Sequence, residues 1–260
     1  MKKTRDKLTE TLGFFDANIW LGIPEGFSLS RELSPGNIKK VLGDYHITGG
    51  LISHWRGKKI SAQDGNSALS GITGFIPKDC YLIWTGLPLF PREKGPLPGI
   101  GRPSSRLAGV RIFPKSHNFP LAEWTLNSLC SWLLKHCLPL FIWHTEIDWS
   151  SLRQLAITFP RLTIVIESQP QKILYQTRPL FALMRDCRNI TVEISNLAGQ
   201  GLIEYVVEEF GAHRLLFGSF LPMNDPLVPI GMILDADITK KEKKLIAGGN
   251  FRQLIKGITL

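Results

Sequence analysis

The sequence has no apolar run approaching the ~18 residues that a membrane-spanning helix requires. Its basic start, Met1–Lys7, is not followed by an apolar stretch, so the pattern predicts neither a secretory signal nor a membrane partner. We therefore expect a cytoplasmic domain. The 260 residues are 43% hydrophobic and 20% charged, which is an ordinary globular composition with enough apolar side chains for a large core.

Cysteine is scarce and has no metal-binding spacing. Cys80, Cys130, Cys137 and Cys187 include no Cys-x-x-Cys pair, and three of the four lie in apolar segments. We interpret them as free, mostly buried thiols of a reducing compartment.

The basic residues lack the pattern of a nucleic-acid surface. The net charge is +9, yet the cations are scattered in the short clusters Lys2–Lys7, Arg56–Lys59 and Lys240–Lys244. No stripe joins aromatic and basic residues as in an RNA-binding strand. We therefore predict no nucleic-acid partner, and a solvated basic surface that favours anionic small molecules.

Short apolar runs are what the chain does have, and they alternate with segments of helical spacing. Such runs are typical of strands buried on both faces, and strands alternating with helices indicate parallel βαβ units. The predicted strands are Phe14–Trp20, Gly49–Ser53, Cys80–Trp84, Gly109–Phe113, Leu138–His144, Leu162–Glu167, Ile190–Ile194 and Leu215–Ser219. The clearest predicted helices are Leu121–His136, Ser150–Phe159, Pro179–Cys187 and Leu202–Phe210. The pattern predicts an α/β fold, a single-domain (β/α)₈ TIM barrel over residues 1–260, with residues 1–10 as a loose extension.

The connection 85–108 departs from this alternation of strands and helices. Its density of proline and glycine excludes a long helix, and it follows a strand, so it should leave the barrel at the mouth, the end at which the strands finish. Two interpretations stay open. It is either a lid that carries Arg92, Lys94 or Arg102 over a pocket, or a plain surface loop.

Several segments, in order along the chain, carry a resemblance to a known family. They are the strand Phe14–Gly22, the Gly-Val-Arg-Ile-Phe-Pro run at 109–114, the Leu-Pro-Leu-Phe-Ile-Trp-His-Thr run at 138–145, Phe-Pro-Arg-Leu at 159–162, Arg-Leu-Leu-Phe-Gly-Ser at 214–219 and Ala-Gly-Gly-Asn-Phe-Arg-Gln-Leu at 247–254. Together they resemble the amidohydrolase superfamily, in its branch related to aminocarboxymuconate-semialdehyde decarboxylase. The resemblance implies a TIM barrel with its active site at the mouth.

The resemblance also implies a divalent metal, which this chain is poorly equipped to hold. In that family the ligands are a first-strand His-x-His, a histidine each on the fifth and sixth strands, and an eighth-strand aspartate. The corresponding residues here are Asn18, Trp20, His144, Ser168 and Phe220, so one of the five ligands remains. An indole nitrogen only donates hydrogen bonds. We therefore expect no cofactor and a lost metal site; a zinc site built on His144, Asp16 and a distant third ligand is the alternative.

Polar residues at the predicted strand ends define the candidate site. His144 is the candidate general base, with Glu146 or Glu167 orienting it, because histidine titrates near neutral pH. The candidate substrate-binding residues are Asn18, Trp20, Arg111, Lys115, His117, Glu193 and Ser219. A structural interpretation stands beside this one, in which Glu167 and Glu193 form buried salt bridges with Arg111 or Arg178.

Three functions follow from these residues. The first is a metal-independent hydrolase for a small carboxylated, anionic substrate such as a lactone or amide. The second is a non-catalytic barrel that binds a metabolite or a partner, and the third is a metal enzyme with rearranged ligands. A carboxylate bonded to His144 would favour the first, whereas Trp20 and Phe220 filling the mouth would favour the second. The resemblance also makes a homodimer possible.

Overall fold

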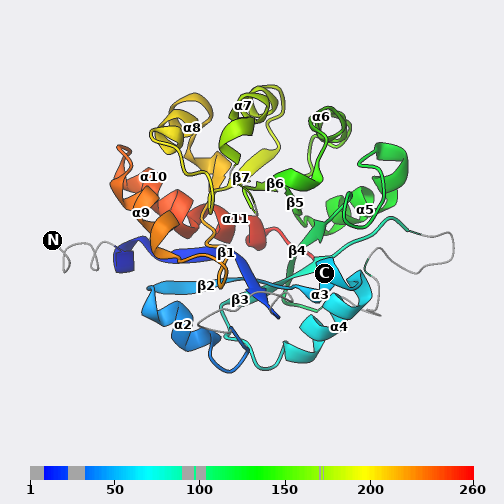
Figure 1. The fold of residues 1–260 in the computed structure, drawn as a ribbon, viewed down its shortest axis with the longest axis horizontal. Helices are drawn as coiled ribbons and strands as arrows, with labels where there is room; N and C mark the ends of the chain where they lie inside the picture. The colour runs from blue at the N-terminus through cyan, green and yellow to red at the C-terminus, as the bar shows by residue number, and fades with distance from the viewer. Residues whose placement is uncertain (1–8, 23–32, 90–96, 98–103, 170, 172) are drawn as a thin grey trace.

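Eight parallel strands form one sheet whose order follows the sequence, from β1 to β8 (Figure 1). The computed structural model describes residues 9–22, 33–89, 97, 104–169, 171 and 173–260. The strands are β1 (Phe14–Leu21), β2 (Ile47–His54), β3 (Cys80–Thr85), β4 (Leu107–Ile112), β5 (Leu140–Trp143), β6 (Ile164–Glu167), β7 (Ile190–Glu193) and β8 (Leu215–Leu216). All eight predicted strands are confirmed, and the sheet is the TIM barrel that the pattern indicates.

Backbone hydrogen bonds bring the two ends of the sheet together. The amide of Ala17 donates to Phe217 O at 2.9 Å, and the amide of Trp20 donates to Leu221 O at 2.8 Å. These bonds join β1 to the segment that follows β8. The barrel is therefore nearly closed although β8 itself contains only two residues.

Helices surround the barrel, in the connections between strands and in the segment after β8 (Figure 1). They are α2 (Ile38–Asp44), α3 (Arg56–Lys59), α4 (Ala62–Ile72), α5 (Glu123–His136), α6 (Trp149–Thr158), α7 (Thr177–Asp186), α8 (Leu202–Phe210), α9 (Leu227–Asp235), α10 (Lys240–Lys244) and α11 (Asn250–Lys256). The four predicted helices are confirmed within two residues at each end. Local signals set some of these ends. The Asp148 carboxylate caps α6 by accepting from the amide of Ser151, for example.

The predicted fifth strand extends too far. β5 ends at Trp143, and residues His144–Glu146 form a turn of 3₁₀ helix. His144, which was expected to end the strand, therefore begins this turn, and successive 3₁₀ residues do not alternate between two faces as strand residues do. Likewise, β1 has a register shift between Asp16 and Ile19, so side chains do not alternate strictly along it either.

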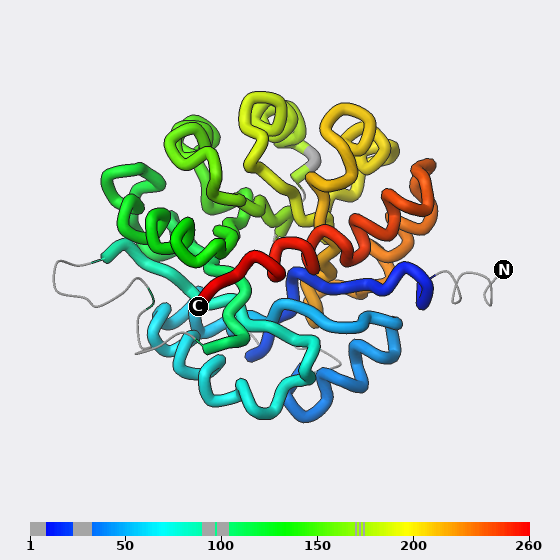
Figure 2. Tube along the Cα trace, turned by 180° about the vertical axis from the view of Figure 1, so that it is seen from behind, coloured from blue at the N-terminus to red at the C-terminus, as the bar shows by residue number. Residues whose placement is uncertain are grey.

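The end of the barrel at which the strands begin is filled by apolar side chains and covered by α11. Phe15, Leu51, Phe141 and further residues from other strands form a buried cluster with Phe251 of α11, whose ring stacks on Phe15 at 4.5 Å. Figure 2 shows α11 crossing this end of the barrel. This end is therefore closed by packing alone, and any chemistry has to lie at the opposite end.

Several other predictions can be compared with the described residues. Cys80, Cys130 and Cys187 are buried free thiols, as predicted, and Cys137 is exposed. Arg92, Lys94 and Arg102 of the proposed lid lie outside the described residues, as do residues 1–8 of the predicted extension. Within the described part of the chain, we find no helix long and apolar enough to cross a membrane.

Candidate functional site at the barrel mouth

A buried ion pair lies inside the barrel beneath the mouth. Arg111 of β4 donates two hydrogen bonds to Glu167 of β6, at 2.7 Å and 2.5 Å, and a third to the hydroxyl of Ser53. Both charged side chains are almost fully buried. Burial raises the pKa of Glu167, and the charge and hydrogen bonds of Arg111 act against that rise. The predicted Arg111–Glu167 salt bridge is confirmed, so this arginine is occupied by a protein carboxylate.

A second buried carboxylate, Glu193 of β7, has no cationic partner among the described residues. It accepts from the Asn18 side chain at 3.1 Å and from the amide and hydroxyl of Ser195 at 2.5 Å and 2.9 Å. The alternative interpretation, in which Glu193 forms a salt bridge with Arg111 or Arg178, does not hold, since Arg111 binds Glu167 and Arg178 is exposed on α7. Burial raises the pKa of Glu193 to about 8, with a further contribution from the Glu167 charge.

The third buried carboxylate, Asp16 of β1, ties the first strand to the end of β8. Its carboxylate accepts hydrogen bonds from the backbone amides of Asn18 and Ser219, each at 2.9 Å, and from the Ser219 hydroxyl. Burial raises its pKa to about 6, although these hydrogen bonds oppose the shift. The neighbouring Gly218 lets the chain approach Glu193, because a Cβ there would collide with the Glu193 carboxylate. Ser219 is therefore hydrogen-bonded to Asp16 and does not face an open pocket.

Five aromatic side chains cover this charged layer and fill the mouth. We call Trp20, Trp55, Phe113, Trp143 and Phe220 the mouth cluster. Their ring centroids lie 4.7 to 6.4 Å apart in the contacting pairs. Each residue is less than a tenth exposed. Trp20 connects the two layers, because its indole nitrogen donates to the Asn18 side chain at 2.7 Å and its ring faces the Arg111 guanidinium at 4.5 Å.

The mouth also contains buried nitrogen atoms that have no hydrogen-bond partner. Among the described residues, nothing accepts from the indole nitrogens of Trp55 and Trp143 or from the side-chain amide of Gln169, which follows β6. Leaving a donor buried and unpaired costs about 1–3 kcal/mol. Such donors mark positions at which water or a ligand with acceptor oxygen atoms would be stabilised.

Lys58 of α3 is a second cation beside these rings, in addition to Arg111. Its ammonium lies 4.9 Å from the ring centres of both Phe113 and Trp143, and it forms a 2.7 Å ion pair with Glu146. Glu146 also accepts from the Ser116 amide and hydroxyl, at 2.9 Å and 2.5 Å. Burial would raise the pKa of Glu146, but the hydrogen bonds from Lys58 and Ser116 outweigh it and lower the pKa.

The remaining predicted site residues are turned toward the backbone. Nδ1 of His144 lies 3.3 Å from Glu167 O, so the predicted orientation of His144 by Glu146 is not formed. Burial lowers the pKa of His144 and keeps the ring neutral near pH 7. His117 packs its ring against Phe113, with Nε2 3.3 Å from Lys58 O. The exposed Lys115 donates to Thr145 O at 2.9 Å.

The donor set here does not fit a divalent metal. Beside the retained His144, the positions that the resemblance implies for metal ligands hold an amide, an indole, a hydroxyl and a phenyl ring, and within the described residues no group of three or more His, Cys, Asp or Glu side chains could hold a metal ion. Asp16, the alternative ligand, accepts hydrogen bonds from Asn18 and Ser219. Phe220, at the expected aspartate position, has a left-handed φ of 61° and directs its ring into the mouth cluster.

Comparison with known proteins identifies the fold but no close relative. No protein-family model matches the chain, and no curated protein matches it. Among solved structures, 5-carboxyvanillate decarboxylase from Sphingomonas paucimobilis is 14% identical, with a TM-score of 0.68 over 95% of this chain and 100% of that chain. An amidohydrolase from Bifidobacterium longum subsp. infantis is 13% identical, with a TM-score of 0.67 over 94% of this chain and 98% of that chain.

A third solved structure is named as a dihydroxybenzoic acid decarboxylase from Polaromonas sp. JS666 with bound manganese and the inhibitor 2-nitroresorcinol. It is 12% identical, with a TM-score of 0.67 over 94% of this chain and 97% of that chain. The chain thus has the barrel fold of amidohydrolases and of related decarboxylases. The fold that the sequence resemblance implies is confirmed across nearly the whole chain.

Proposed function

We propose that this barrel binds a small carboxylated aromatic compound at its mouth and does not perform metal-dependent chemistry on it. The observation that carries the proposal is the set of unpartnered N–H groups on Trp55, Trp143 and Gln169. A carboxylate supplies acceptors for several such donors at once, and the surrounding rings favour a flat aromatic body.

Electrostatics support an anionic ligand. Lys58 lies within cation–π distance of Phe113 and Trp143, and Lys115 is exposed beside it on the loop after β4. The solved structures of the same fold include decarboxylases named for 5-carboxyvanillate and dihydroxybenzoic acid, which are carboxylated aromatics. A ligand of that kind would lie against the mouth cluster, with its carboxylate toward the free indole groups.

The filled mouth favours binding over catalysis. Trp20 and Phe220 are 1% and 4% exposed, and they lie among the charged layer and the aromatic rings. The carboxylates Asp16, Glu167 and Glu193 all have protein partners beneath those rings. A substrate would have to displace the cluster before it could reach them.

Salicylate titrated into chelator-treated protein tests this proposal by calorimetry. We expect binding that is weakened about 10-fold in Trp143→Phe, since one hydrogen bond to a charged group is worth roughly 1.5 kcal/mol. Trp124→Phe, at a tryptophan that is 76% exposed on α5, is the matched control and should leave the affinity unchanged. Salicylamide, which lacks the charge, should bind more weakly. Equal affinity for both compounds, or no difference between the two variants, would contradict the proposal.

A metal-independent hydrolase for a carboxylated substrate, lactone or amide is the second candidate. It is favoured by the neutral His144 and by the raised pKa values of Asp16 and Glu193, because perturbed groups of this kind are common in active sites. His144 would act as general base, with Glu146 and Glu167 near it. Hydrolysis of dihydrocoumarin by chelator-treated protein, lost in His144→Gln, would establish this function. Absence of turnover alongside salicylate binding would leave the binding barrel.

A further inference from the structure

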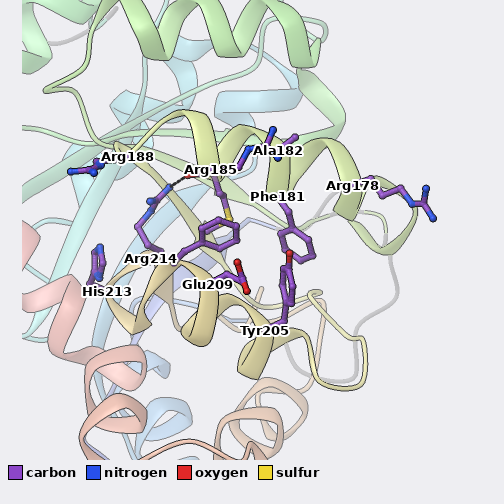
Figure 3. Close-up of a pocket in the computed structure, with 11 residues that line it drawn as sticks. Arg178, Phe181, Ala182, Arg185, Arg188, Tyr205, Glu209, His213 and Arg214 are labelled. Atoms are coloured by element: carbon purple, nitrogen blue, oxygen red, sulfur yellow. Dashed lines mark hydrogen bonds between the residues drawn. The ribbon is translucent and has the colours of Figure 1, made fainter.

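A groove of about 740 Å³ lies on the outer surface between α7 and α8, away from the mouth cluster (Figure 3). Its apolar part consists of three aromatic rings. Phe181 of α7 lies 4.8 Å from Tyr205 and 6.2 Å from Phe210, which are both on α8. Tyr205 is 42% exposed, and the other two are half-buried. An aromatic surface of this kind, rimmed by polar residues, is typical of interaction sites.

Positive charge borders this aromatic surface along α7 and just beyond it. Arg178 and Arg185 are seven residues apart, which places them along one side of the helix, and Arg188 follows the end of α7. Within the described part of the chain, Arg178 and Arg188 have no carboxylate at ion-pair distance, and Arg185 reaches Asp186 at 3.5 Å. Figure 3 shows Phe181 and Tyr205 together, Arg178 beyond one end and Arg188 near the other.

The end of the groove near Arg188 is also positive and is rigidly held. Arg214 is 5% exposed and donates to Ile190 O, Met184 O and Cys187 O, at 2.5, 3.1 and 2.8 Å. His213 lies beside it, and partial burial together with the Arg214 charge lowers the pKa of His213. Glu209 is the one acidic residue that lines the groove.

We propose that the α7–α8 groove docks an acidic amphipathic helix of a partner protein. A helix laid in a groove uses apolar residues at every third or fourth position, and the three rings would receive them. The seven residues from Arg178 to Arg185 span roughly 10 Å along α7, which exceeds the reach of one carboxylate but matches two acidic residues two turns apart on a partner helix.

Two other occupants fit the groove less well. A second copy of this chain would bring a further +9 charge to an already positive surface. A nucleic acid would meet the arginines, but Glu209 lies among the aromatic rings on which bases would have to stack. On a protein partner, the residue opposite Glu209 would be basic or neutral, and this would fix the register of the helix.

Fluorescence anisotropy with labelled synthetic helices tests the proposal on the intact chain. The probe is an amphipathic peptide with leucine on one face and glutamate along its flank; its controls are a lysine counterpart and a scrambled peptide of identical composition. We expect the ordered acidic peptide to bind, and Arg178→Glu with Arg185→Glu to weaken it at least 10-fold. Lys240→Glu with Lys241→Glu on α10 makes the same change of charge elsewhere and should change binding by less than about twofold. Tyr205→Ala should weaken binding about fivefold.

Several results would overturn the proposal. Binding of the lysine or scrambled peptide as tightly as the acidic one would do so, as would equal weakening by the α10 variant, because net charge alone would then explain the result. Absence of any peptide binding would also overturn it. An oligouridine that binds to the wild type and not to the α7 variant would assign the groove to nucleic acid instead. Salicylate binding at the mouth should be unaffected by the α7 substitutions, so the two proposals fail separately.

Discussion

The mouth and the α7–α8 groove each combine arginine with aromatic rings, but the arginine is buried and paired at the mouth and exposed in the groove. At the mouth, Arg111 is buried, bonded twice to Glu167 and covered by Trp20. In the groove, Arg178 and Arg188 are exposed and have no carboxylate partner among the described residues. A charge inside the barrel must be satisfied by the protein itself, whereas a charge on the surface is satisfied by water until a partner replaces it. Under the two proposals, recognition at the mouth would depend on neutral N–H donors, and recognition in the groove would depend on charge.

The largest expected effect comes from breaking the buried pair. Arg111→Met leaves the Glu167 carboxylate buried without its partner and should lower the free energy of unfolding by about 3–5 kcal/mol in urea titrations. Adding Glu167→Leu should restore much of the loss, because the unpaired charge is then gone. Lys40→Met, in an exposed pair with Asp44, is the control and should cost less than about 0.5 kcal/mol. A loss below about 1 kcal/mol for Arg111→Met would show that the pair is not truly desolvated.

The second prediction concerns Glu193 and pH. Its folded-state pKa is raised to about 8 from 4.5, so the folded protein keeps a proton that the unfolded chain releases between these values. The free energy of unfolding should therefore fall as pH rises from 5 to 8, by an amount on the order of a few kcal/mol. It should level off above pH 8. Glu193→Gln should flatten this dependence in melting curves recorded across that range. Glu208→Gln, an exposed change on α8, should leave the slope as it is. An unchanged slope in Glu193→Gln would contradict the buried, protonated state.

A smaller effect is expected from the hydrogen bond between Trp20 and Asn18. Trp20→Phe keeps an aromatic ring in the mouth cluster but leaves the Asn18 side-chain oxygen buried without its 2.7 Å donor. This should cost about 1–3 kcal/mol of unfolding free energy. Trp124→Phe removes an exposed indole and should be silent in the same assay. If the two variants were equally stable, the hydrogen bond from Trp20 to Asn18 would not contribute to stability, and Trp20 would act only through packing.

The smallest effect on stability is expected in the groove. Arg178→Glu with Arg185→Glu replaces two cations with two carboxylates, yet should alter the free energy of unfolding by less than about 0.5 kcal/mol, because both side chains are exposed. Urea titration beside wild type measures this. A loss of several kcal/mol would mean that these arginines support the fold instead of awaiting a partner.

The fold could be predicted from the sequence because it depends on the alternation of apolar strand runs with segments of helical spacing. A strand such as β5, Leu-Phe-Ile-Trp, is apolar on both faces, and that signal is visible without any knowledge of its neighbours. The helix α8 was predicted with its observed ends, and the Arg111–Glu167 pair followed from two charges at the ends of apolar strands. The two-residue β8 and the 3₁₀ turn at His144 were not predictable, since hydrogen bonds to distant segments decide them.

The site was predicted only in part, because its arrangement depends on contacts far apart in the chain. Lys58 and Gln169 were not proposed as site residues, although both lie in segments that follow strands, at the end of the barrel where active sites are expected. Their relation to Trp143 follows from the closure of the barrel and not from spacing. For Glu193 the sequence left a site role and a salt bridge to an arginine both open. Burial without a cation among the described residues raises the pKa of Glu193 to about 8, which favours a third state, the protonated carboxyl group.

The central claim, that free indole N–H groups at the mouth hold a carboxylate, is tested most directly by nuclear magnetic resonance of the seven tryptophan side chains. With ¹⁵N-labelled tryptophan, the indole signals of Trp55, Trp143 and the exposed Trp124 are assigned from single phenylalanine variants. Saturating salicylate in the presence of a chelator should move the Trp55 and Trp143 N–H protons downfield, as expected when each gains an acceptor, while the Trp124 signal stays in place. Unmoved Trp55 and Trp143 signals at saturation, or equal movement of all indoles, would contradict the claim.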